Sequence, residues 1–208
     1  MLARVSSLES FRQWRGDEEQ TASDLVEWLT TDNPSEAMLA GTALHKALEN
    51  AEEGDHETLE ANGYTFHMPD ATLALPSVRE VRGYSGYGGL VVTGQVDAVD
   101  GKRIDDHKST GSFAPDRYLS GYSWRLYLEM FGCHVFRWNV FEIKPDPKLA
   151  KVYTVKPPHI LEAYSYPGMR EDCADLARDF QEFATNHLPL GWGPAGLKHP
   201  GALLEQYK

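Results

Sequence analysis

The stretch GQVDAVDGKRIDDHKST, residues 94–110, constrains the fold more than any other part of the chain. Two runs with apolar and β-branched residues flank Asp100-Gly101, and a glycine accepts the positive φ that a two-residue type I′ turn requires. The stretch therefore predicts a β-hairpin in which Val99 pairs with Lys102.

This register decides which side chains share a face of the hairpin. It pairs Asp97 with Ile104 and Gln95 with Asp106. Because side chains alternate along a strand, one face then carries residues 95, 97, 104, 106 and 108. Asp97 and Asp106 thus lie on neighbouring strands, with Lys108 two residues further along the same face.

Two carboxylates that lie close together repel each other unless a cation sits between them. Mg²⁺ binds oxygen ligands and keeps several waters. A neighbouring lysine can orient or deprotonate a water, or stabilise the negative charge that develops when a phosphodiester is attacked. The pattern therefore indicates metal-dependent hydrolysis. The alternative is a solvated face on which Lys108 only pairs with an acid.

Three helices are expected before the hairpin. Ser6 and Glu9 have the spacing of a capping box, residues 22–31 form a short helix, and a longer helix runs from a Ser35 cap to Gly54. The apolar residues of the longer helix follow a 3.6-residue period and are expected to be buried, namely Met38, Leu39, Leu44, Ala47 and Leu48.

The remaining elements complete an alternating order. They are expected as strands over 77–84, 90–99 and 102–110 with turns at 85–89 and 100–101, a helix over 114–132 that ends at Gly132, a strand over 134–143, and a helix over 168–188 before a tail from Pro189. This order predicts an α/β fold around a mixed sheet.

Composition limits the class of protein. With 208 residues, 41% of them hydrophobic, the chain can bury one sizeable core, so we expect a single domain. Its parts would be N-terminal helices (1–60), a catalytic sheet and helix (77–143) and a C-terminal helix and tail (168–208). Cys133 and Cys173 fit neither a disulfide framework nor a zinc site. Without a leader pattern or an apolar run of about 18 residues, we expect a cytoplasmic protein with no membrane partner.

The net charge of −11 disfavours a polyanionic partner, because nucleic acids are bound largely by lysine and arginine. The charge is uneven, however. Residues 79–156 hold 12 basic and nine acidic residues, whereas residues 1–78 hold four and 15. The positive segment contains the hairpin, and the acidic N-terminal segment suggests a surface that binds a partner or excludes substrate.

These residues resemble the PD-(D/E)XK nuclease superfamily, in its RecB-like and lambda-exonuclease-like branch of phage-type recombination exonucleases. The motif acids are Asp97 and Asp106, and the D-x-K element is Asp106-His107-Lys108. The resemblance implies a restriction-endonuclease-like core, with a central mixed sheet of a three-strand meander plus a further strand, flanked by helices.

Three further features accompany the motif. Gly41 and His45 match a G-x-x-x-H element whose histidine helps to bind the metal in this branch. Tyr127 matches the tyrosine of a Q-x-x-x-Y element, although Ser123 stands where the glutamine would be. Glu80 matches an acidic residue that an early strand often presents.

The resemblance implies that His45, Asp97, Asp106 and the backbone carbonyl of His107 bind Mg²⁺ or Mn²⁺, while Lys108 positions or activates the attacking water. Iron–sulfur members of the superfamily use four cysteines, and this chain has two, so no iron–sulfur cluster is expected. No G-x-x-x-x-G-K-[ST] element occurs, so no nucleotide cofactor is expected either.

The implied substrate is DNA, as linear duplex with a free end, cleaved by an exonuclease. The expected contacts are phosphate contacts from Arg79, Arg82, Arg117 and Arg125 and stacking from Tyr118, Tyr122 and Trp124, although each aromatic side chain also suits a core. The family further implies a ring-shaped homo-oligomer, a recombination partner protein, and DNA recombination or repair in a bacterial or phage-infected cell. A structure- or site-specific endonuclease and a catalytically silent DNA-binding or assembly protein stay open as alternatives.

Overall fold

The computed structural model describes residues 1–31, 33–52, 54–68, 72–73, 75–76 and 78–193. Its helices are α1 (Val5–Arg15), α2 (Ala22–Thr30), α3 (Glu36–Asn50), α4 (Pro115–Leu119), α5 (Ser123–Phe131) and α6 (Met169–His187). Its strands are β1 (Leu2–Arg4), β2 (Gly54–Asp55), β3 (Thr58–Ala61), β4 (Tyr64–His67), β5 (Thr72–Leu73), β6 (Val78–Tyr87), β7 (Leu90–Asp100), β8 (Arg103–Thr110), β9 (Val135–Pro145), β10 (Val152–Val155) and β11 (His159–Tyr164).

A mixed sheet forms the centre of the molecule. Nine strands of the described residues pair in the order β1-β7-β8-β9-β10-β4-β3, with β6 added on β7 and β11 added on β9, while β2 and β5 form a separate pair. The β1–β7 and β8–β9 pairs are parallel, and the β6–β7 and β7–β8 pairs are antiparallel. The expected meander of β6, β7 and β8 is therefore one part of a larger mixed sheet.

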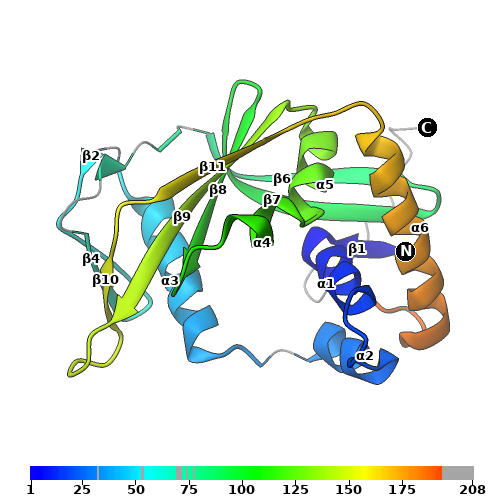
Figure 1. Cartoon of the computed structure of the whole chain (residues 1–208), viewed down its shortest axis with the longest axis horizontal. Helices are drawn as coiled ribbons and strands as arrows, with labels where there is room; N and C mark the ends of the chain where they lie inside the picture. The colour runs from blue at the N-terminus through cyan, green and yellow to red at the C-terminus, as the bar shows by residue number, and fades with distance from the viewer. Residues whose placement is uncertain (32, 53, 69–71, 74, 77, 194–208) are drawn as a thin grey trace.

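Helices pack on the sheet in two groups (Figure 1). One group consists of α1, α5 and α6, which pack against one another and against β7 around an apolar core that includes Leu8, Leu126 and Phe180. The other is α3, which packs on β3, β4 and β8. The long central strands thus have α3 on one side of the view and α1, α2 and α6 on the other.

The hairpin is present, but its turn differs from the expected one. Asp100 pairs with Arg103 and Val99 with Ile104, so the turn consists of Gly101 and Lys102 instead of Asp100 and Gly101. The register is therefore shifted by two residues. An even shift preserves the faces of both strands, so the expected grouping of side chains survives.

The N-terminal helices correct two local predictions. Ser6 lies inside α1, which starts after Arg4 without a side-chain cap, so the expected Ser6 capping box is wrong. Ser35 does cap α3 through the Met38 amide, as expected. The helix ends at Asn50, before Gly54, because Ala51 already adopts an extended conformation.

Two further features differ in part from the sequence prediction: the buried residues of α3, and the helix expected over 114–132. Leu44, Ala47 and Leu48 are buried, but Met38 and Leu39 are exposed and lie outside the buried stripe of the helix, which begins at Ala40. The segment after β8 divides into α4 and α5 around Gly121, and the second helix ends, as expected, at Gly132 in a left-handed conformation. No helix in the described part of the chain is long and apolar enough to cross a lipid bilayer.

Candidate active site

Three acidic residues form a row across β6, β7 and β8. Arg79 pairs with Ala98, and Ala98 pairs with Asp105, so Glu80, Asp97 and Asp106 are each the neighbour in sequence of one of these paired residues on adjacent strands. The β6–β7 pairing skips Glu80 and Asp97, and Glu80 has a φ of 54°, which a side-chain-bearing residue rarely adopts. The strands are thus locally distorted where the acids meet, as is frequent at functional sites.

Asp106 and Lys108 form an ion pair on β8. The Lys108 Nζ atom lies 3.0 Å from Oδ1 and 2.9 Å from Oδ2 of Asp106. Asp106 is 5% exposed, whereas the Lys108 side chain is 43% exposed, so the ammonium group can reach solvent or a ligand. The buried Oδ2 atom of Asp106 has the Lys108 ammonium as its ion-pair partner and accepts no further hydrogen bond from the described residues.

The environment sets the charges of this row. Burial raises the pKa of Asp106, and the charge of Lys108 opposes that rise. Burial alone would also raise the pKa of Asp97, but interactions with His45 and Lys108 outweigh it and lower the pKa to about 2. Burial likewise favours neutral Lys108, yet the charges of Asp106 and Asp97 raise its pKa. Lys108 is therefore an ammonium at neutral pH, and a hydrogen-bond donor.

His45 reaches the row from α3. Its Nδ1 atom lies 3.6 Å from Oδ2 of Asp97. The close approach of α3 to β8 depends on Gly41, because a Cβ atom there would lie 2.8 Å from Oγ of Ser109. The G-x-x-x-H spacing therefore has a physical reason: the glycine lets the helix approach the strand, and the histidine one turn later reaches Asp97.

His107 contributes its backbone to the site. Its amide donates a hydrogen bond of 2.6 Å to Oδ2 of Asp97. Its buried imidazole lies near the Phe141 ring, with centroids 6.1 Å apart, on the face away from Asp106. The sequence prediction for His107 named the backbone carbonyl, and the burial of the ring is consistent with a backbone role.

Glu80 lies at the edge of the row. Its pKa depends in part on Gln95 and Glu49, to which the sequence analysis assigned no role. Gln95 donates a hydrogen bond from Nε2 to Oε2 of Glu80. Burial raises the pKa of Glu80, the hydrogen bond from Gln95 lowers it, and the charges of Asp97 and Glu49 raise it. Glu49 lies four residues after His45 on α3, and this helical spacing is the signal that could have indicated it.

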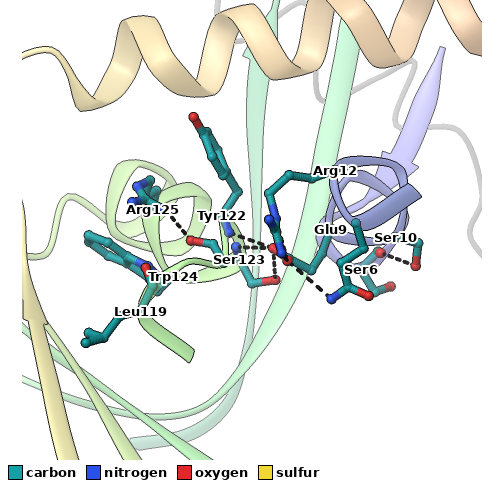
Figure 2. A network of polar contacts seen from close by, with 11 residues as sticks. Ser6, Glu9, Ser10, Arg12, Leu119, Tyr122, Ser123, Trp124 and Arg125 are labelled. Carbon is teal, nitrogen blue, oxygen red and sulfur yellow. Dashed lines mark hydrogen bonds and ion pairs between the residues drawn. The ribbon is translucent and has the colours of Figure 1, made fainter. Parts of the chain in front are cut away.

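Tyr127 packs from α5 onto β7, over the glycine three residues before Asp97. A Cβ atom at Gly94 would lie 2.4 Å from Cε1 of Tyr127, so the ring occupies the space that this glycine leaves. Burial, followed by the charge of Asp106, raises the pKa of Tyr127 to about 12. Ser123, at the position where the family motif has glutamine, instead binds Glu9 of α1 (Figure 2).

The residues expected to contact DNA have different environments. Arg79 donates hydrogen bonds to the carbonyls of Leu48, Glu49, Ala51 and Pro76, so it anchors the end of α3. Trp124 is 6% exposed and donates to the Leu119 carbonyl, so it belongs to the core.

The other expected DNA contacts are more accessible. Arg125 stacks over Tyr122 and Trp124 and donates to the hydroxyl of Tyr166, whereas Arg82 bonds Gln95 and Arg117 is exposed. Tyr118 packs on Phe113 and is partly buried. Among the expected phosphate contacts, Arg82 and Arg117 are the ones that the structure leaves at the surface.

The donors of the row suit a hard divalent cation. They are two carboxylates, one of them with a buried oxygen whose partner among the described residues is the Lys108 ammonium, and a histidine on an adjacent helix. In the part of the chain that the structure describes, no group of three or more His, Cys, Asp or Glu side chains has the arrangement of a metal-binding cluster.

Comparison with known proteins bears on the fold. No protein-family model and no curated protein matches this sequence. The crystal structure of a "Putative exonuclease" from Eubacterium rectale is similar with a TM-score of 0.53 and 13% identity, over 96% of this chain and 91% of that chain. The crystal structure of SSO0001 gives a TM-score of 0.46 and 16% identity, over 93% of this chain and 78% of that chain. The chain thus has a mixed α/β fold, with a central mixed sheet flanked by helices that is consistent with a restriction-endonuclease-like core.

Proposed function

We propose that this protein is a metal-dependent deoxyribonuclease that hydrolyses phosphodiester bonds at the ends of linear DNA. The observation that carries the proposal is the row of Glu80, Asp97 and Asp106, with Lys108 two residues further on β8 and His45 facing Asp97. A solvated face would not bury Asp106 to 5% exposure beside a second carboxylate.

Each residue of the row has a role in this proposal. Asp97, Asp106, His45 and the backbone carbonyl of His107 would hold Mg²⁺ or Mn²⁺. When bound, such a cation lowers the pKa of a water and neutralises charge on the phosphate. Lys108, whose ammonium group is partly exposed, donates hydrogen bonds that orient the attacking water or stabilise the phosphate oxygens.

The choice of an exonuclease rests on the resemblance of the motifs, and the name of the Eubacterium rectale neighbour agrees with it. Exposed Arg82 and Arg117 are proposed to bind the DNA backbone. A ring-shaped oligomer, a recombination partner and a role in recombination or repair are proposals on the same basis.

The test compares end-labelled linear duplex with closed circular duplex, each with Mn²⁺, Mg²⁺ or EDTA. Metal-dependent loss of only the linear DNA is expected, and the label released first gives the strand polarity. Asp106→Asn serves as the matched inactive control, because it keeps the shape of the side chain. Cleavage of the circle would favour the endonuclease, and wild-type protein that cleaves neither DNA would contradict the proposal.

A further inference from the structure

The carboxylate of Glu9 joins two helices that are far apart in the sequence (Figure 2). Its Oε2 atom accepts hydrogen bonds from the amides of Tyr122 at 2.6 Å and Ser123 at 3.0 Å, and from Oγ of Ser123 at 3.3 Å. Its Oε1 atom accepts a hydrogen bond of 2.8 Å from Arg12. Both oxygens are therefore engaged, and the Glu9 side chain is 15% exposed.

This contact replaces a local cap at the start of α5. The first amides of a helix lack partners within the helix, and the helix dipole favours a negative charge at this end. Tyr122, the residue before α5, makes no side-chain capping bond. Glu9 supplies both the acceptor and the charge from another element, 113 residues earlier in the chain.

The helix that carries Glu9 is fixed to the strand that carries Asp97. β1 pairs with β7 through Leu2 with Val91, and α1 begins directly after β1. The Cγ2 atom of Val5 lies against Gly94, where a Cβ atom would approach it to 2.9 Å. Through α1 and β1, Glu9 therefore fixes the start of α5 relative to β7.

The start of α5 in turn places Tyr127. This residue lies four positions after Ser123, on the same face of the helix, and its ring fills the space over Gly94 of β7. α5 is thus held to β7 at two points, by the Tyr127 ring directly and by Glu9 through α1. A shift of the first turn would move Tyr127 relative to the row of acids.

We propose that Glu9 is a positioning residue for the active site, which fixes the first turn of α5 and with it the Tyr127 ring over Gly94 of β7, three residues before Asp97. The expected effect of Glu9 on the rate of cleavage rests on the proposed nuclease function. The expected effect of Glu9 on the position of Tyr127 does not depend on that function.

Three substitutions and one stability control test the proposal. Glu9→Ala removes both acceptors, and Glu9→Gln keeps one neutral acceptor. Glu18→Ala removes an exposed carboxylate nearby. Thr21→Ala removes the side-chain cap of α2, so it lowers stability without touching α5.

The first readout is kinetic, on linear duplex well below the melting temperature. We expect Glu9→Ala to lower kcat by about tenfold or more with KM within about twofold of wild type, because a small misplacement of an active-site group costs rate more than binding. Glu9→Gln should fall between Glu9→Ala and wild type. Glu18→Ala and Thr21→Ala should keep the wild-type kcat.

The second readout does not depend on activity. With 3-fluorotyrosine placed at position 127, the ¹⁹F resonance should shift in Glu9→Ala and stay in place in Thr21→Ala. An unchanged resonance in Glu9→Ala, or an equal loss of kcat in Thr21→Ala, overturns the proposal. If wild-type protein cleaves no DNA, the nuclease proposal fails, and the ¹⁹F resonance alone then decides for or against the role of Glu9.

Discussion

The backbone amide of His107 donates a hydrogen bond of 2.6 Å to the side chain of Asp97, at the point where the β7–β8 pairing ends. Because Asp106 precedes His107, this bond fixes the two aspartates relative to each other. The pKa of Asp97 is low because the interactions with His45, and then the charge of Lys108, outweigh the effect of burial, so this acceptor is an ionised carboxylate. The two acids of the hairpin are therefore positioned by the backbone before any ligand binds.

Loss of the buried carboxylate should abolish cleavage. Asp106→Asn is expected to lower kcat by at least about 100-fold, since an amide provides neither the charge nor the second acceptor oxygen. The far-UV circular dichroism spectrum should match wild type. Asp116→Asn, on the exposed surface of α4, is the control and should keep full activity. Equal activity of the two variants would remove Asp106 from the site.

His45 should contribute to metal affinity. We expect His45→Ala to weaken Mn²⁺ binding by about tenfold in a calorimetric titration, with a smaller effect on the melting temperature, because the ring is partly exposed and faces Asp97. His67→Ala, on the exposed side of β4, should leave the Mn²⁺ affinity unchanged. An unchanged affinity in His45→Ala would count against metal ligation.

The space over Gly94 should tolerate no side chain. In Gly94→Ala the new Cβ atom meets Tyr127 and Val5 in a packed region, so the free energy of unfolding should fall by about 1–3 kcal/mol. Gly86→Ala, on the adjacent strand β6, is the matched control because no atom of the described residues lies within 4 Å of its Cβ position. Urea denaturation measures the stability of both variants. Equal stability of Gly94→Ala and Gly86→Ala would contradict the close packing over Gly94.

Arg79 and Arg117 should separate stability from DNA binding. Arg79→Ala removes the donor that caps α3, and we expect the free energy of unfolding to fall by about 1–3 kcal/mol. Arg117→Ala should leave stability unchanged and raise KM for DNA, because its side chain is exposed. Stability and KM are measured on both variants. A stability loss in Arg117→Ala together with a raised KM but unchanged stability in Arg79→Ala would contradict these roles.

Both cysteines should be unreactive in the folded protein. Burial raises the pKa of Cys173 to about 12, and it also raises the pKa of Cys133. A thiol whose pKa lies above its ordinary value contains little thiolate at pH 8, and the thiolate is the reactive form. Labelling with a disulfide reagent at pH 8 should be slow in native protein and rapid in urea. Rapid labelling of native protein would contradict the burial.

The sequence by itself determined the local features of this protein. The hairpin, the shared face of Asp97, Asp106 and Lys108, the Ser35 cap and the helix end at Gly132 depend on alternation, turn chemistry and capping, which act over a few residues. The side-chain period of two keeps the faces correct even though the turn lies one residue later than expected, which shifts the pairing register by two residues.

The tertiary structure decided what depends on distant partners. Short strands such as β3, β4, β10 and β11 have weak local patterns, so only their pairing partners define them. Glu9 has the spacing of a local capping box, yet it caps α5, because the packing of α1 against α5 brings a stronger set of donors to its carboxylate. Arg79 likewise anchors the end of α3, and the charge of Glu49 on α3 adds to the effects of burial and of Asp97, which raise the pKa of Glu80 on β6. No sequence spacing specifies these contacts, since each depends on how the helices pack on the finished sheet.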